Sequence, residues 1–163
     1  VERELHAADE RRIRCQTQGD AGFLASLVES CDDAIIGQRL DGSVVTWNAG
    51  AEHLYGYSAA EMVGRSITVL YPAYRPDELA EVMRRVSQGE HVHHLETVRL
   101  RKDGSAVEVS VTYSPVKGPA GRIIGASVVA RDITRRKQEE TERLNLIEDL
   151  TSALARSNAT APK

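Results

Sequence analysis

The sequence predicts an α+β fold built on an antiparallel β-sheet, and three observations support this. Two Asp-Gly dipeptides, at 41–42 and 103–104, each lie between apolar runs, as in tight hairpin turns. Residues 107–113 alternate apolar and polar side chains, which is typical of a strand with one buried face. Residues 48–87, between the two turns, have helical spacing instead. Two strands, a helical middle and three further strands favour a sheet with helices packed against it.

A short helix and a hairpin open the predicted domain. Apolar side chains recur at helical spacing between Phe23 and Val28, so an amphipathic helix is expected there. Residues 34–37 begin the first strand, and residues 43–47 return along it after the first Asp-Gly turn. Asn48 follows at once, and its side chain is suited to cap the N-terminus of the next helix.

The middle of the domain is predicted to contain short helices interrupted by glycine and proline. The longest is expected to begin near Pro76, with the proline in its first turn, and to end at Gly89. One face of this helix is apolar and consists of Leu79, Val82, Met83 and Val86.

Three longer strands complete the predicted sheet. Residues 94–101 lead to the second Asp-Gly turn, residues 107–113 return, and residues 115–121 make a longer turn. Residues 123–130 are nearly all apolar or small, which predicts a central strand covered on both faces.

Both ends of the chain are polar and have the four-three spacing of a coiled-coil seam. An N-terminal helix is predicted over residues 1–20 and a C-terminal helix over residues 135–163, with a disordered end from Ala159. Because a short helix is marginal alone in water, the N-terminal helix needs a partner or a neighbouring domain. The C-terminal helix is expected to leave the domain and pair further on, in a homodimer. The seam residues are Leu5, Ala8 and Cys15 in the first helix and Leu144, Ile147 and Leu154 in the second.

The C-terminal segment has a second interpretation. Leu146 and Leu150 lie off the seam, so the pattern is also compatible with an amphipathic helix that folds back on its own sheet.

Composition limits the possible partners and the location of the chain. The formal net charge of −3 over 163 residues argues against a broad nucleic-acid surface. No apolar run approaches the ~20 residues needed to span a bilayer, and no signal peptide is visible. Two cysteines make no disulfide framework and suit a reducing cytoplasm. The start at Val1 rather than Met suggests a fragment of a longer protein.

Five short motifs follow one another along the chain. They are Asn48-Ala49-Gly50-Ala51-Glu52, Leu54-Tyr55-Gly56-Tyr57-Ser58, Glu61-Met62-Val63-Gly64-Arg65, Arg101-Lys102-Asp103-Gly104 and Arg131-Asp132-Ile133-Thr134. In this order they resemble the PAS (S-box) family of sensor domains over roughly residues 21–134.

The resemblance implies a five-stranded antiparallel sheet with short helices on one face, enclosing a small pocket. It also implies a sensory role, with the signal passed through the flanking helices to an effector domain in the same parent chain. The parent is expected to be a bacterial sensor histidine kinase of a two-component system, with a diguanylate cyclase or a phosphatase as alternatives.

The last motif also has a physical interpretation. Asp132 ends the final strand, and its carboxylate can cap the helix that follows and interact favourably with the helix dipole. The strand and the output helix would then be joined without a flexible loop. The residues of this predicted signal relay are Asp132, Ile133 and Thr134.

The expected interior is apolar, and the pattern cannot separate a ligand pocket from a packed core. The packed core is the favoured interpretation; if there is a pocket, it would take a small apolar metabolite. The candidate lining residues are Ile36, Leu79, Met83, Val86, Val109, Val111, Ile124 and Val128.

No cofactor is predicted. Blue-light PAS domains carry a reactive cysteine after the Gly-Arg pair, whereas Ser66 follows here, which excludes a flavin–cysteinyl adduct. Heme oxygen sensors of the family place an axial histidine on the long helix, and no histidine lies between Pro76 and Gly89 here, so the resemblance disfavours heme. His91 and His93 would share one face of a strand, but no cysteine or carboxylate accompanies them at metal-ligand spacing, so a solvent-exposed strand end is the favoured interpretation.

Catalytic motifs are missing from the sequence. It has no glycine-rich phosphate loop, no Gly-x-Ser-x-Gly motif, and no histidine after His94 to accept a phosphoryl group. The chain is therefore predicted to be a non-catalytic input module. The alternative is a ligand-free scaffold for dimerisation or protein interaction.

Overall fold

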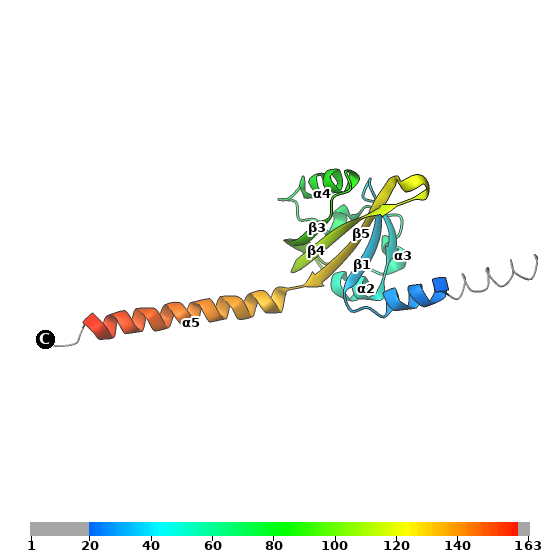
Figure 1. Cartoon of the computed structure of the whole chain (residues 1–163). Helices are drawn as coiled ribbons and strands as arrows, with labels where there is room; N and C mark the ends of the chain where they lie inside the picture. The colour runs from blue at the N-terminus through cyan, green and yellow to red at the C-terminus, as the bar shows by residue number, and fades with distance from the viewer. Residues whose placement is uncertain (1–19, 160–163) are drawn as a thin grey trace, which may run out of the picture.

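The computed structural model describes residues 20–159 (Figure 1). A helix over residues 20–29 precedes an antiparallel sheet, and short helical segments lie between its second and third strands. The strands are β1 (Ala34–Arg39), β2 (Val44–Trp47), β3 (Val92–Leu100), β4 (Ala106–Lys117) and β5 (Ile123–Asp132). The helical elements are α2 (Ala49–Tyr55), α3 (Ala59–Met62), η1 (Ile67–Leu70), α4 (Glu78–Ser87), η2 (Pro119–Gly121) and α5 (Thr134–Ala159).

The five strands form one sheet in the order β2-β1-β5-β4-β3, with all neighbours antiparallel. The segments α2 to α4 lie against one face of this sheet, and the core fills the space between them (Figure 1). Alternate residues of β4 point into that core, namely Val107, Val109, Val111 and Tyr113. The predicted α+β class and the five-stranded antiparallel sheet are confirmed.

Both Asp-Gly dipeptides form the expected tight turns. Gly42 and Gly104 have φ values of 83° and 84°, a region that glycine enters without steric cost. In each turn the aspartate accepts a hydrogen bond from the backbone two residues later, at 2.8 Å from Ser43 N in one and 2.8 Å from Ser105 N in the other.

Asn48 caps α2 as predicted and also joins three parts of the fold. Its Oδ1 accepts from Ala51 N at 2.9 Å, which is the cap itself, and from Ile35 N of β1 at 2.8 Å. Its Nδ2 donates to the carbonyl of Val28 at 2.9 Å, in the helix over residues 20–29. A single buried side chain thus anchors the leading helix to the domain.

Several predicted boundaries are wrong by one or two residues. β3 begins at Val92 rather than at 94. Pro76 lies before the N-cap Asp77 and therefore outside the first turn of α4. The helix α5 includes Ala159, where a disordered end was expected.

The prediction that β5 is covered on both faces is wrong for the described residues. β5 is central in the sheet, but Val129 and Ile124 are exposed on the face opposite the helices. The strand is continuously apolar because the outer face of this sheet is itself apolar there, with Val45 and Val116 as neighbours.

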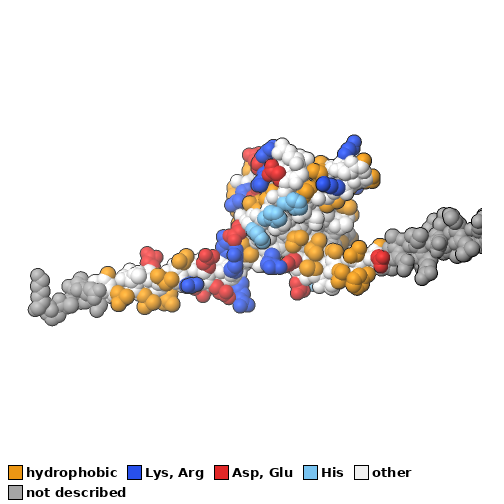
Figure 2. Space-filling view, viewed as in Figure 1, with side chains coloured by type: hydrophobic (Ala, Val, Ile, Leu, Met, Phe, Trp, Pro, Cys, Tyr) orange, Lys and Arg blue, Asp and Glu red, His pale blue; other side chains and the backbone are white. Residues whose placement is uncertain are grey.

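The helix α5 extends away from the sheet instead of folding back on it (Figure 1). Its leucines are exposed both on the predicted seam, as at Leu144 and Leu154, and off it, as at Leu146. Apolar side chains are visible along α5 and on the helix over residues 20–29 (Figure 2). The fold-back interpretation is therefore wrong, while the N-terminal seam residues Leu5, Ala8 and Cys15 lie outside the described residues.

Candidate functional site

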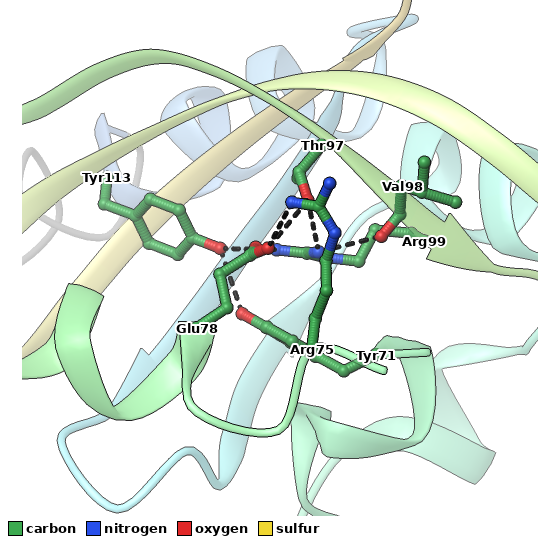
Figure 3. Close-up of polar contacts among 7 residues, drawn as sticks. All are labelled: Tyr71, Arg75, Glu78, Thr97, Val98, Arg99 and Tyr113. Atoms are coloured by element: carbon green, nitrogen blue, oxygen red, sulfur yellow. Dashed lines mark hydrogen bonds and ion pairs between the residues drawn. The ribbon is translucent and has the colours of Figure 1, made fainter. Parts of the chain in front are cut away.

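A cluster of polar side chains lies in the interior, between α4 and the sheet (Figure 3). It is called the arginine cluster here and is centred on Arg99 of β3. Its buried or partly buried members are Tyr71, Glu78, Thr97, Arg99 and Tyr113, and the exposed Arg75 lies at its edge.

The side chain of Arg99 is only 3% exposed, and its guanidinium group has several bonding partners. Its Nη2 lies 2.5 Å from Glu78 Oε1 and 3.3 Å from the Tyr113 hydroxyl. Its Nη1 donates to Thr97 Oγ1 at 3.2 Å and to the carbonyl of Val98 at 2.9 Å. The guanidinium carbon also lies 3.8 Å from the centre of the Tyr71 ring, a cation–π contact.

The carboxylate of Glu78 receives three donors. Besides Arg99, Thr97 Oγ1 donates to Glu78 Oε2 at 2.8 Å and Arg75 Nη1 donates to the same oxygen at 3.2 Å. Burial raises the pKa of Glu78, but the hydrogen bonds from Arg99 and Thr97 outweigh it, so the pKa lies below its ordinary value. Glu78 is therefore ionised at neutral pH.

The two tyrosines of the cluster are linked to each other. Their hydroxyl oxygens are 3.1 Å apart, so one donates to the other. Burial raises the pKa of Tyr71 far above its usual range, and the neighbouring Tyr113 raises it further. Tyr71 thus stays neutral at physiological pH and keeps its proton for hydrogen bonding.

Seven of the eight predicted pocket residues lie in or against the core on the inner side of the sheet. Leu79 is partly buried, and the buried ones are Ile36, Met83, Val86, Val109, Val111 and Val128. The eighth, Ile124, is 52% exposed on the outer face. Lys117 pairs with Ile123 and Val116 with Gly125, so Ile124 lies at a bulge that reverses the expected alternation.

The arginine cluster was missed by the sequence analysis, although the strand pattern contains a signal for it. Alternation along β3 places Thr97 and Arg99 on one face of the strand, and both are buried. A buried charge is rare without a partner, however, and Glu78 is 21 residues away on α4. Only the fold brings the two together.

The junction between β5 and α5 is fixed by several contacts. Asp132 Oδ1 accepts from Thr134 N at 2.8 Å, which is the predicted capping interaction, and Asp132 Oδ2 lies 3.3 Å from Arg101 Nη2. Ile133 is buried, and its N–H donates to the carbonyl of Glu108 at 2.9 Å. α5 thus begins on the sheet itself.

The first turn of α5 is also tied to the outer face of β3 and β4. Lys137 Nζ lies 2.9 Å from Glu96 Oε2 and 3.7 Å from Glu108 Oε2, and Arg136 pairs with Glu96 as well. Glu96 is the neighbour of Thr97 in β3. One edge strand therefore contacts the arginine cluster with one face and α5 with the other.

Histidines gather on the surface at the start of β3 (Figure 2). His91 and His93 stack with ring centres 5.6 Å apart, and His93 and His94 rings are 6.4 Å apart. Within residues 20–159, no group of three or more histidine, cysteine or acidic side chains is arranged to hold a metal ion.

The model of the family described as "PAS fold" matches residues 22–133. The chain belongs to the PAS family. Its curated relatives include the signal transduction histidine-protein kinase AtoS of Escherichia coli, which is 31% identical over 79% of this chain and 22% of its own length. Two-component system protein A of Emericella nidulans is 38% identical over 61% of this chain and 14% of its own length.

Solved structures agree with this assignment. The PAS domain of a Colwellia psychrerythraea protein has a TM-score of 0.64 at 27% identity and covers 71% of this chain and 98% of its own. An RNA-binding light-oxygen-voltage receptor has a TM-score of 0.65 at 27% identity, covering 86% and 39%. The two curated relatives are named as a two-component system protein and a signal transduction histidine-protein kinase, and this chain spans less than a quarter of the length of either.

The light-oxygen-voltage similarity raises the question of flavin, and the residues do not fit a flavin–cysteinyl adduct. The hydroxyl of Ser66, after the Gly-Arg pair, bonds with Thr68 at the start of η1. Cys31, the cysteine within the described residues, lies in the segment before β1.

None of the described helices is long and apolar enough to cross a membrane.

Proposed function

We propose that this PAS domain is the input module of a two-component histidine kinase and that it relays its signal as a homodimer through α5. The effector domain would belong to the same parent chain; this sequence covers 14% and 22% of the length of the two curated relatives named above. The observation that carries the proposal is the rigid junction at which β5 becomes α5.

The relay in this proposal consists of Asp132, Ile133 and Thr134. The Asp132 cap and the buried Ile133 leave no flexible residue between sheet and helix. A shift of β4 against β5 would move the carbonyl of Glu108, to which Ile133 is bonded, and would turn the start of α5. Lys137 would follow, since it bridges two strands.

The homodimer is supported by the apolar surface that the described residues leave uncovered. Leu144, Ile147 and Leu154 are exposed at seam spacing on a helix of 26 residues. A helix with this pattern buries its seam by pairing with an identical one. The predicted N-terminal seam would extend the same dimer, in the cytoplasm and without nucleic acid as a partner.

The alternative function is a ligand-free scaffold, and one observation favours it. The predicted pocket residues, apart from Ile124, pack in the core, and the arginine cluster fills the space beside α4 with its own partners. In this alternative the module would hold two kinase chains together and sense nothing. In either case the catalytic step would belong to another domain of the parent.

Cross-linking tests the relay. The seam series continues from Leu144 four residues back to Glu140. In the full chain with Cys15→Ser and Cys31→Ser, Glu140→Cys introduces a thiol at this seam position, and Glu142→Cys introduces one on the opposite face. We expect rapid intermolecular disulfide formation at position 140 and little at 142. Asp132→Ala should change the rate at 140, because it removes the cap that joins β5 to α5. Equal rates at both positions, or a rate insensitive to Asp132→Ala, would contradict the proposal.

A further inference from the structure

We propose that the arginine cluster is a carboxylate-binding site that Glu78 fills from within the chain. A small molecule with a carboxylate group would take the place of Glu78 and release the first turn of α4. That this exchange constitutes the sensed signal rests on the proposed function; the binding itself does not.

The donors around Glu78 form a receptor for a carboxylate group. Arg99 Nη2 approaches one oxygen at 2.5 Å, while Thr97 Oγ1 at 2.8 Å and Arg75 Nη1 at 3.2 Å approach the other. A guanidinium and a hydroxyl that serve both oxygens of a planar group match a carboxylate better than a spherical anion. All three donors come from residues outside α4.

The receptor is organised independently of Glu78. Thr97 and Arg99 are fixed by the pairing of β3 with β4. The Arg99 guanidinium also bonds to the carbonyl of Val98 at 2.9 Å and to the hydroxyl of Tyr113 at 3.3 Å, and it lies on the ring of Tyr71. Removing the Glu78 carboxylate would leave the buried, oriented guanidinium of Arg99 without a counter-charge, and binding another anion would remove that energetic cost.

Glu78 lies in the first turn of α4, which is less buried than the turns that follow. It is the first residue of that helix, and the side chain of the N-cap Asp77 makes no capping hydrogen bond. Leu79 packs only partly against the core, whereas the buried residues Val82, Met83 and Val86 lie further along. An incoming carboxylate could therefore displace the first turn, at the cost of the Leu79 contact, while the rest of α4 stays in the core.

A hollow of about 220 Å³ reaches the cluster from the surface. Its lining includes Arg75 and Thr97 of the cluster, and Ile133 and Lys137 at the output junction. The carboxylates of Glu96 and Glu108 also line it, and both are paired with the Lys137 ammonium. A small anion in this hollow would reach the Arg75 and Thr97 donors first. The hollow also adjoins Ile133 and Lys137, which anchor α5. A carboxylate bound there would therefore lie close to the start of α5.

Chemical rescue of Glu78→Ala tests the site, with formate, acetate and propionate as probes. This variant in the full chain vacates the receptor without adding a group that fills it. We expect a saturable rise in its thermal midpoint with these carboxylates, and none with chloride at equal ionic strength. The matched control is Glu81→Ala, one turn later on the exposed side of α4, which should show no carboxylate-specific rise.

A second measurement covers the case in which Glu78→Ala is largely unfolded. The same carboxylates should then restore its folded content by circular dichroism, and Glu78→Gln, whose amide fills the receptor, should not respond. No carboxylate-specific effect in either measurement would overturn the proposal. Stronger rescue by phosphate than by acetate would also overturn it, because the site would then select another anion. Neither readout depends on pairing of α5, so failure of the cross-linking test would count against the relay alone.

Discussion

Arg99 and Glu78 bury opposite charges where water would otherwise solvate them. Taking such a pair out of water costs several kcal/mol per ion, and the cost is offset only if hydrogen bonds satisfy the remaining donors and acceptors. Here Thr97, Tyr113 and the carbonyl of Val98 supply those bonds. The pair therefore adds little net stability when intact, but each partner depends strongly on the other.

Breaking the pair from one side should be costly. Arg99→Met leaves the Glu78 carboxylate facing a site without its main donor, and we expect a loss of about 3–5 kcal/mol in the free energy of unfolding by urea. The double variant Arg99→Met/Glu78→Gln should lose clearly less than the sum of the single variants. Arg84→Met, which breaks the exposed pair with Glu81, is the control and should change little. Additive losses would contradict the coupling.

Stability should also fall in acid through Glu78. Its folded pKa is below the ordinary value of 4.5, so the unfolded state takes up the proton first as the pH falls. This contribution is fully present above about pH 4.5 and is lost as the pH decreases toward the folded pKa. Urea unfolding as a function of pH should therefore show a shallower acid decline for Glu78→Gln than for the unaltered protein. Identical slopes would show that Glu78 is not the titrating group.

At this scale the sequence located the apolar core well but not its polar centre. The helical spacing of Val82, Met83 and Val86 and the alternation along β4 correctly placed the buried residues. No local pattern marks Arg99 and Glu78 as partners, because pairing across 21 residues depends on how α4 lies against β3. Such a contact is a property of tertiary packing and not of local pattern.

The elements are held together by a few close backbone and side-chain contacts, of which Asn48 is the clearest. It satisfies backbone groups in the helix over residues 20–29, in β1 and in α2. The side chain of Asn48 therefore connects all three of these elements.

Asn48→Ala should therefore cost more than an ordinary cap. The loss of the cap contributes about 1 kcal/mol, and the buried backbone groups left without partners add about 1–3 kcal/mol. Chemical unfolding checks the sum, and hydrogen exchange should quicken in residues 20–29. Ser58→Ala, at the exposed capping box of α3, is the comparison and should cost less. Equal losses would show that Asn48 acts only as a cap.

The close approach of β5 to β1 requires glycine at position 125. A Cβ there would lie 2.2 Å from the carbonyl oxygen of Gln38, a backbone atom that cannot move aside cheaply. Gly125→Ala should lower the thermal midpoint markedly. Gly22→Ala is the matched control, because nothing lies within 4 Å of its Cβ in the leading helix, and it should be neutral or stabilising. A tolerated Gly125→Ala would contradict the strand geometry.

The same region explains why one element-scale prediction failed. Alternation predicted that Ile124 points inward with Val128, and the bulge opposite Val116 and Lys117 reverses it. A bulge depends on how two strands are paired, and the apolar run 123–130 gave no sign of it because both faces are apolar there. The order of elements, both Asp-Gly turns and the Asn48 cap were all predictable, since each depends on residues adjacent in sequence.

The whole molecule presents apolar side chains on three surfaces that the described residues leave uncovered. They are the helix over residues 20–29, the outer face of the sheet and α5 (Figure 2). On α5 the exposed leucines lie both on and off the predicted seam, so substitution can separate the two sets.

Seam substitutions should dissociate the proposed dimer. Leu144→Glu/Leu154→Glu places charges at positions that a parallel pair of helices would bury, and we expect the assembly to shift to single chains in sedimentation velocity. Leu146→Glu introduces the same charge on the opposite face of α5 and should leave the assembly unchanged. If Leu146→Glu dissociates the assembly and the seam variant does not, the interface lies on the other face of α5. If neither variant changes the assembly, α5 is not part of the interface.

The central claim is that this PAS domain works as a homodimer whose output helices pair. Light scattering coupled to size exclusion, on the full chain at high concentration, tests it most directly. The account predicts a molar mass of twice the 17.9 kDa chain. A mass of one chain that persists at the highest concentration would contradict it.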